Sequence, residues 1–432
     1  MAVTVEAGGT ARTTDRKGSA RAVALVSSAH FTSHFYLLLL PPLFPLLREA
    51  YGVGYTELGF AISVFSIVTA CTQAPVGFAV DRFGARRILA AGLLLEGAAF
   101  VLIGLAPFYG TLVALMAVAG LANAVYHPAD YSLLNASVDP RRMGRAFSFH
   151  TSAGMLGNAV APVTMVFLMT LMDWRAALAL CGAVGIGVGL VVILGGGVLK
   201  DRAARAADGT AEPDGAGAAA SGATGIRLLL SAPILLGTLF FFGMSVAGYG
   251  IQSFSVSALH ILHDAPIVEA TTVLSAYLFA SPVGVLAGGW VADRIRRRHD
   301  AFAATCIVMV AICIGLVAAL RPSLPVVAGL FVVAGFFSGM VAPSRDMLIR
   351  SMTPPSEIAK VFGFVSTGFN LGGIIAPVTF GFLLDRSDNP GIVFWTVSLV
   401  SLATVFTVLT TGRARSRPRG GGLGRRRRVS GR

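Results

Sequence analysis

Histidine and aspartate side chains recur at helical spacing in two apolar stretches of the sequence. His30 and His34 are four residues apart, and His127 and Asp130 are three apart, so each pair lies on one face of a helix. Because an imidazole gains or loses a proton near neutral pH, these residues predict a site that carries a proton. Two histidines at this spacing also suit a metal ion, and hydrogen-bonded packing is a third interpretation. No HExxH pattern or cysteine partner accompanies them, so we expect no metal.

The elements that must position these side chains are long and apolar. Of the 432 residues, 55% are hydrophobic and 13% are charged, about half the charged fraction of a soluble protein. This composition excludes a soluble enzyme, a disordered chain and a secreted disulfide scaffold. Stretches long enough to cross a bilayer occur at 22–47, 55–80, 86–107, 110–138, 145–170, 174–198, 228–260, 267–292, 301–320, 323–352, 358–384 and 391–412. Because they are continuously apolar rather than alternating, they predict an all-α integral membrane protein with twelve transmembrane helices.

The basic residues indicate how the chain is oriented and divided. Lysine and arginine concentrate in alternate loops and in both tails, which predicts cytoplasmic termini in the cell (inner or plasma) membrane. The net charge of +13 then serves topology and contacts with anionic lipid, and we expect no nucleic-acid partner. A segment rich in Gly, Ala and Ser separates the spans six and six. The expected divisions are a tail (1–21), a six-helix bundle (22–198), a linker (199–227), a second bundle (228–412) and a basic tail (413–432).

An internal repeat relates the two sets of six spans. Four residues of the first half recur 215 residues later in the second half: Pro128, Pro140, Gly157 and Pro162 correspond to Pro343, Pro355, Gly372 and Pro377. A parallel repeat of this kind predicts two pseudo-symmetric six-helix bundles of the same orientation.

Two short motifs resemble those of a known family. The sequence Gly77-Phe-Ala-Val-Asp81-Arg82-Phe-Gly84-Ala-Arg86-Arg87, between the second and third spans, resembles the loop signature of the major facilitator superfamily. A weaker copy, Gly289-Trp-Val-Ala-Asp293-Arg294, follows the eighth span. More narrowly, Tyr126-His127-Pro128-Ala129-Asp130 resembles the fosmidomycin-resistance-like branch. The resemblance implies the superfamily's fold, a small-molecule substrate, no cofactor and a monomer.

The resemblance also implies a gate at the signature loop. In the family, the counterpart of Asp81 caps the cytoplasmic end of the eleventh helix, where a carboxylate gains from exposed N–H groups. Gly77 is expected to let the second and eleventh helices approach, and Gly84 to permit the tight turn. By pseudo-symmetry, Asp293 would act in the same way on the fifth helix.

The resemblance implies further that the first, fourth, seventh and tenth helices line a central pathway. Each of them carries polar side chains, which are costly against lipid and should face a water-filled cavity. The expected pathway residues are His30, His34, Asn123, His127, Asp130, Tyr249, Gln252 and Arg345.

Asp130 and Arg345 occupy corresponding positions of the repeat and carry opposite charges. We expect them to form an ion pair near the pseudo-symmetry axis, because pairing offsets the cost of a charge in the membrane. A purely structural pair is the alternative to one that breaks during the transport cycle. Asp346 follows Arg345 in the chain and is expected to lie on a different face of the helix. His150 is a weaker candidate for carrying the proton. The sequence predicts no partner for Glu96.

Together these features predict a secondary active transporter of a small organic solute, working by alternating access. The branch resemblance favours proton-coupled efflux by antiport. Because Arg345 and the histidines also suit an anion, import of a small organic anion by proton symport is the alternative. No phosphate-binding glycine loop or GxSxG nucleophile occurs, so we expect no enzyme activity; a membrane-embedded enzyme and a transport-inactive sensor or scaffold are remote alternatives.

Overall fold

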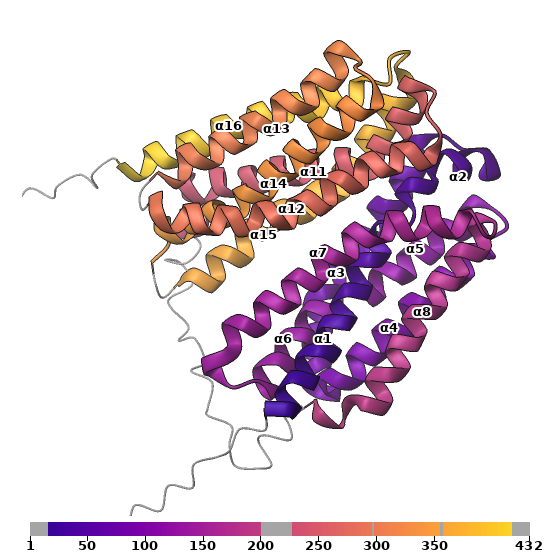
Figure 1. Cartoon of the computed structure of the whole chain (residues 1–432). Helices are drawn as coiled ribbons and strands as arrows, with labels where there is room; N and C mark the ends of the chain where they lie inside the picture. The colour runs from indigo at the N-terminus through magenta and orange to yellow at the C-terminus, as the bar shows by residue number, and fades with distance from the viewer. Residues whose placement is uncertain (1–15, 200–226, 296–297, 355–356, 417–432) are drawn as a thin grey trace, which may run out of the picture.

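The computed structural model describes residues 16–199, 227–295, 298–354 and 357–416 (Figure 1). The first fifteen residues of the expected N-terminal tail, nearly all of the 199–227 linker and the basic tail beyond residue 416 lie outside the described residues. Within the described ranges the chain is helical and contains no strand.

Two helical bundles account for these residues. The N-terminal bundle contains α1 (Arg16–Leu37), η1 (Pro41–Leu43), α2 (Phe44–Tyr51), α3 (Tyr55–Phe83), α4 (Ala85–Gly104), α5 (Tyr109–Asn123), α6 (Tyr126–Ser137), η2 (Pro140–Arg142), α7 (Met143–Met169), α8 (Trp174–Gly195) and η3 (Gly196–Val198). The C-terminal bundle contains α11 (Ala232–His263), α12 (Ile267–Ile295), α13 (His299–Leu320), α14 (Leu324–Met352), α15 (Ile358–Arg386) and α16 (Ile392–Ser416).

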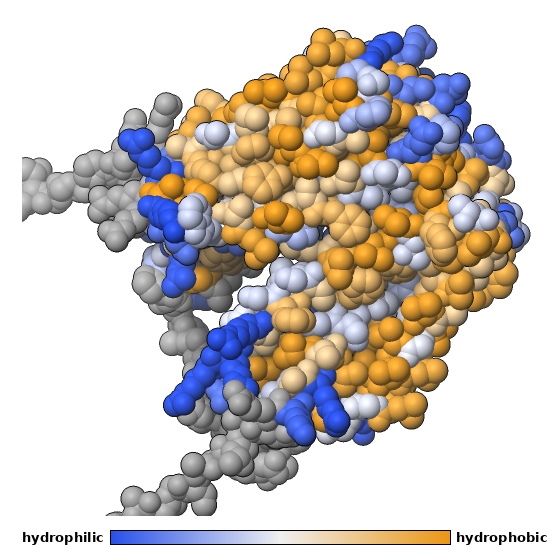
Figure 2. All heavy atoms as spheres, viewed as in Figure 1, coloured by the Kyte–Doolittle hydropathy of each residue, from blue (hydrophilic) through white to orange (hydrophobic). Residues whose placement is uncertain are grey.

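The predicted number of membrane spans is confirmed. Twelve helical units in the described part of the chain are long and apolar enough to cross a bilayer, from Lys17–Tyr51 to Ile392–Thr410. Figure 2 shows an apolar surface across the middle of the molecule, with hydrophilic residues gathered toward its ends. This distribution is the one that a surrounding bilayer requires.

Two of the twelve spans are interrupted where the sequence predicted continuous helices. In the first span, α1 ends at Leu37, four residues before Pro41. In the fourth span, α5 ends at Asn123, and the next residue, Ala124, lies four residues before Pro128. A proline lacks the N–H that would bond the carbonyl four residues earlier, and its ring crowds that carbonyl. The interruption in the fourth span places a break in the helix directly before His127 and Asp130.

The two bundles touch at one end of the molecule and separate toward the other (Figure 1). We call the end that holds the α3–α4 turn at Gly84 the basic end, and the opposite end the closed end. At the closed end α3 packs on α15 so tightly that a methyl group on Gly59 would overlap the carbonyl of Pro377. Near the basic end, a methyl group on Gly77 would have no neighbour within 4 Å. The space between the bundles is therefore open toward the basic end.

Candidate functional site

Histidines from three helices converge with Asp130 in the N-terminal bundle. His30 and His34 belong to α1, His127 and Asp130 to α6, and His150 to α7. Helix α1 packs closely on α7 because Gly154 of α7 has no side chain: a methyl group there would lie 2.8 Å from Cδ2 of His30. The small residue thus creates the room that the imidazoles occupy.

The Asp130 carboxylate is the centre of this histidine–aspartate cluster. Its Oδ2 lies 3.0 Å from Nε2 of His150 and 3.4 Å from Nδ1 of His30. The rings of His30 and His150 stack with centroids 3.8 Å apart and planes at 20°. Asp130 is 0% exposed, and His30 and His150 are 4% and 2% exposed. A carboxylate so completely removed from water requires a balancing charge or proton, because an isolated buried charge is strongly unfavourable.

The arrangement of Asp130 with its two imidazoles is suited to holding one shared proton. The proton can reside on either ring and leave an ion pair with Asp130, or on the carboxyl group and leave every group neutral. In the described part of the chain, Oδ1 of Asp130 and Nδ1 of His30 have no hydrogen-bond partner. These two atoms can therefore accept or donate when the proton moves.

His127 and His34 extend the cluster in two directions. The His127 ring lies 5.4 Å from that of His30, and its side chain is exposed, as is that of the neighbouring Tyr131. His34 lies 4.6 Å from His30 and meets Asn158 of α7, with 3.0 Å between Nδ1 and Nδ2. The exposed His127 thus extends the cluster from the buried carboxylate to the surface of the bundle.

A metal ion fits the cluster less well than a proton does. Nδ1 of His30, Oδ2 of Asp130 and Nε2 of His150 lie within 4.8 Å of one another. However, the two imidazole rings are stacked with planes only 20° apart, so one ion would have to be bound by two nearly parallel rings, which is far from a tetrahedral arrangement.

The predicted ion pair between Asp130 and Arg345 is wrong for this conformation. Asp130 is paired with the histidines, and Nε of Arg345 lies 2.8 Å from Oδ1 of Asp346. The guanidinium of Arg345 also rests against the rings of Phe241 and Phe369, with centroids 4.8 and 5.2 Å away. Since the bundles are apart toward the basic end, each supplies its own counter-charge. Asp346 is the next residue along α14, and the long arginine side chain folds back to reach it.

Asn123 points into its own bundle. Its Nδ2 donates to Oε1 of Glu96 on α4 at 3.2 Å, and Glu96 is 0% exposed. This contact supplies the partner for Glu96 that the sequence did not predict. Asn123 was expected to line the pathway, and here it stabilises a buried carboxyl group.

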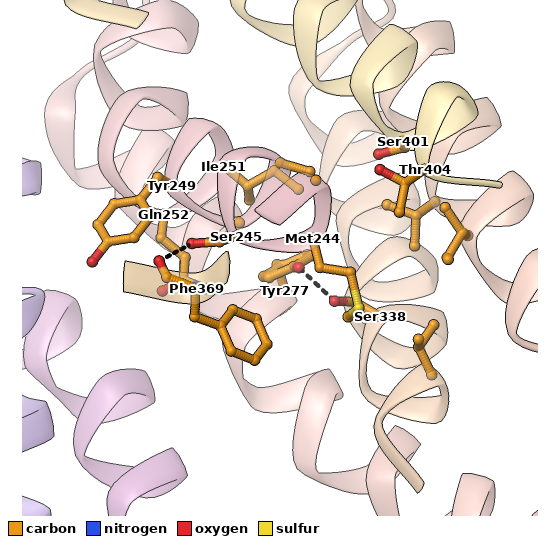
Figure 3. Close-up of a pocket in the computed structure, with 16 residues that line it drawn as sticks. Met244, Ser245, Tyr249, Ile251, Gln252, Tyr277, Ser338, Phe369, Ser401 and Thr404 are labelled. Carbon is orange, nitrogen blue, oxygen red and sulfur yellow. Dashed lines mark hydrogen bonds between the residues drawn. The ribbon is translucent and has the colours of Figure 1, made fainter. Parts of the chain in front are cut away.

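The C-terminal bundle contains a cavity of about 290 Å³ that holds two of the expected pathway residues, Tyr249 and Gln252 (Figure 3). Its polar lining comes from Ser245, Tyr249, Gln252, Tyr277, Ser338, Ser401 and Thr404. Ser245 donates to the carbonyl of Phe369 at 2.9 Å, and Tyr277 donates to Ser338 at 2.9 Å. Many hydroxyl groups on an otherwise apolar wall suit a small polar solute.

A second cavity joins the two bundles. It measures about 100 Å³ and is lined by His34 and Asn158 from the N-terminal bundle and by Tyr249 and Gln252 from the C-terminal bundle. Tyr249 and Gln252 therefore border both cavities. Through His34, the histidine–aspartate cluster borders the second cavity, which shares these two residues with the hydroxyl-lined cavity.

The signature loop has its turn in place but lacks the expected contact with α15. Gly84 adopts φ 91°, a conformation that favours glycine, between α3 and α4. Asp81 and Asp293 are exposed, and among the described residues neither has a hydrogen bond or ion pair. Their latching role stays a prediction about the conformation in which the basic end is closed.

The basic residues of the two motifs make local contacts. Arg82 lies over Phe83 at 5.3 Å, and Arg294 lies over Trp290 at 3.4 Å. Arg86 packs against Gly196 of η3, where a methyl group would lie 2.7 Å from Cδ of Arg86, and Arg87 is exposed.

A methyl group on Gly289, like one on Gly77, would have no neighbour within 4 Å, so both motif glycines face open space here.

Sequence reasoning ranked His150 too low and did not single out Asn158, Ser401 or Thr404. His150 is one of only seven histidines and lies in a span, which is the signal that could have raised its rank. The serine and threonine residues gave no such signal, because hydroxyl groups commonly bond to their own helix.

The fold and these sites define a class of membrane protein: two six-helix bundles with a cavity in one of them and a smaller cavity between them. The model of the Major Facilitator Superfamily matches residues 26–262 and 240–430. The chain belongs to the Major Facilitator Superfamily, whose members that it resembles are transporters of small molecules.

Individual relatives and solved structures agree with this assignment. The chain is 26% identical to SauU, a probable sulfoacetate transporter of Cupriavidus necator, over 80% of this chain and 82% of that protein. It is 24% identical to the fosmidomycin resistance protein of Escherichia coli, over 88% of this chain and 91% of that protein. A bacterial homolog of the human lysosomal transporter Spinster has the same fold, with a TM-score of 0.73 at 14% identity, over 93% of this chain and 96% of that one.

Proposed function

We propose that this chain couples the movement of a proton to the transport of a small organic anion by alternating access. The observation that carries the proposal is the histidine–aspartate cluster: a fully buried carboxylate 3.0 Å from His150, stacked imidazoles, and an exposed His127 beside them. A site of this composition can hold one proton or release it, and its charge then changes by one unit. It lies on α1, α6 and α7, so its charge state acts on contacts among three helices of one bundle.

The other bundle supplies the features that suit an anion. Arg345 is 17% exposed and keeps donors beyond the one that faces Asp346, since a guanidinium carries five N–H groups. It lies on α14 one turn from Val341 and two turns from Ser338, both of which line the hydroxyl-lined cavity. An anionic group at Arg345 and a polar remainder in the cavity would fit this layout. Sulfoacetate, in the name of the relative SauU, is a small organic anion of this kind.

Charge balance favours symport for such a substrate. A protonated cluster in one bundle and an anion in the other attract each other, so binding of each favours binding of the other. Antiport would require the two to compete. We therefore favour import with a proton, although efflux by antiport is a second candidate, supported by likeness to the fosmidomycin resistance protein over 88% of this chain.

The arrangement in the cell follows from the basic residues. We propose that the basic end faces the cytoplasm, together with both termini, in the cell membrane. The structure then corresponds to a conformation open to the cytoplasm. The protein would act as a monomer, with its arginine-rich tail against anionic lipid.

One assay tests both proton coupling and its direction. Purified protein is placed in liposomes that contain a pH-sensitive dye, and small sulfonates, sugar acids and phosphonates are added outside one at a time. Symport predicts that a transported anion acidifies the lumen, and antiport predicts that it makes the lumen alkaline. Entry of a labelled anion without any change in luminal pH would contradict proton coupling.

A further inference from the structure

A carboxylate of the C-terminal bundle caps a helix of the N-terminal bundle at the closed end. Asp385, in the last turn of α15, accepts hydrogen bonds from the first two residues of α3. The backbone N–H of Tyr55 donates to Oδ1 at 2.9 Å, and that of Thr56 donates to Oδ2 at 2.7 Å. The Thr56 hydroxyl donates to Oδ2 at 2.6 Å. Three hydrogen bonds thus join the two bundles through a single side chain.

Helix α3 depends on this contact because its own sequence supplies little capping. The first N–H groups of a helix have no partner within the helix, and a preceding Ser, Thr, Asp or Asn usually satisfies them. Gly54 precedes α3 and has no side chain to do so. Among the described residues, the Glu57 side chain accepts only from the N–H of Gly54, at 3.0 Å. Asp385 therefore does for α3 what an N-cap residue would do, but from the other bundle.

Glycines bring the two helices close enough for the contact. A methyl group on Gly54 would lie 2.6 Å from Oδ2 of Asp385, and a methyl group on Gly381 would overlap the carbonyl of Tyr55. With Gly59 against Pro377, these glycines make a continuous close approach of α3 and α15 at the closed end. Because Gly77, near the other end of α3, has no such neighbour, the close approach is confined to the closed end in this conformation.

We propose that Asp385 is a latch that holds the closed end shut and so sets how much of the protein is open at the basic end. When the closed end opens, α3 moves away from α15 and the three hydrogen bonds break. Helices α3 and α15 are antiparallel, and each has an aspartate near its own C-terminal end: Asp81 on α3 and Asp385 on α15. If Asp81 caps α15 in the opposite conformation, as expected from the sequence, one interbundle cap replaces another during the cycle, and neither conformation is left without one.

The latch can be tested by distance measurements without a substrate or a pH gradient, so its failure is distinct from failure of the proposed transport function. Spin labels are placed at Arg141→Cys and Arg350→Cys, exposed positions near the basic ends of the two bundles, after Cys71→Ser removes the exposed native cysteine. In the parent protein we expect mostly long distances. Asp385→Asn keeps one acceptor oxygen but loses the charge and the second acceptor, and should lower the ratio of long to short distances by about fivefold, the effect of losing one hydrogen bond. Thr56→Val, which removes one of the three donors, should give a smaller decrease.

Two further variants keep the test decisive. Asp388→Asn removes an exposed carboxylate three residues away and should leave the distances unchanged. Gly54→Ala retains Asp385 but displaces its carboxylate, so it should shift the distances in the same direction as Asp385→Asn. The proposal is overturned if both Asp385→Asn and Gly54→Ala, folded as judged by circular dichroism, leave the distances as in the parent. It is equally overturned if Asp388→Asn shifts them as much as Asp385→Asn does.

Discussion

Asparagine at position 130 would remove the charge at the centre of the histidine–aspartate cluster while keeping the shape of the side chain. The change should weaken the contact with His150, whose Nε2 lies 3.0 Å from the Asp130 carboxylate. Both side chains are almost fully buried, so solvent screens their interaction little. A hydrogen bond to a charged group contributes about 1.5–3 kcal/mol, and we expect a coupling free energy of about 2 kcal/mol between the two residues.

A double-mutant cycle measures this coupling directly. The free energy of unfolding is determined by circular dichroism for the parent, Asp130→Asn, His150→Gln and the double variant in detergent micelles. If the two residues form one unit, the double variant loses about 2 kcal/mol less than the sum of the single losses. The matched control is a cycle of His150→Gln with the exposed Asp388→Asn, which should be additive. Additive losses for Asp130 and His150, within about 0.5 kcal/mol, would refute the shared-proton arrangement.

Three further substitutions test the packing around His30, the role of Arg345 and the role of Asp81. Gly154→Ala places a methyl group 2.8 Å from His30, so it should destabilise the protein by about 1–3 kcal/mol and reduce proton coupling. Gly187→Ala meets no neighbour within 4 Å and should do neither. Equal melting curves for the two variants would contradict the close packing of α1 on α7. Arg345→Gln removes a charged donor and should raise the half-saturating concentration of an anionic substrate by about tenfold or more. Arg350→Gln, at an exposed site, should leave that concentration unchanged. Unchanged saturation curves for Arg345→Gln would show that Arg345 does not bind an anion. Asp81→Asn should reduce transport while leaving expression in the membrane intact, and transport at the parent rate would dispose of its latching role.

The sequence predicted the spans far better than the contacts between them. Apolar length alone fixes a transmembrane helix to within a few residues, as for the expected span 55–80 and the observed α3 at Tyr55–Phe83. Even the two interruptions have a sequence signal, since prolines follow each break by one turn. That signal is ambiguous, because α14 continues through Pro343 without a break.

Rotation of the helices about their axes is what the sequence could not supply. The spacing of His30 with His34 and of His127 with Asp130 places each pair on one face, but not the direction in which that face turns. Asp130 therefore meets His150 of α7 in place of the expected Arg345.

The cap formed by Asp385 was missed for a related reason. Its partners, Tyr55 and Thr56, are some 330 residues away in the chain, and two of its three hydrogen bonds go to backbone N–H groups. Backbone groups leave no mark in a residue pattern, so a long-range cap of this kind is visible only in the folded structure.

If one proton accompanies each anion, a pH gradient alone should drive accumulation of the anion. Liposomes containing the purified protein are held at zero membrane potential, with the lumen one pH unit more alkaline than the medium, and a labelled organic anion that the dye assay has identified is added outside. One pH unit is worth about 1.4 kcal/mol per proton, so one-to-one symport predicts luminal accumulation of up to about tenfold. Asp130→Asn should only equilibrate the anion. Equal concentrations inside and outside for the parent protein, despite the gradient, would contradict proton symport.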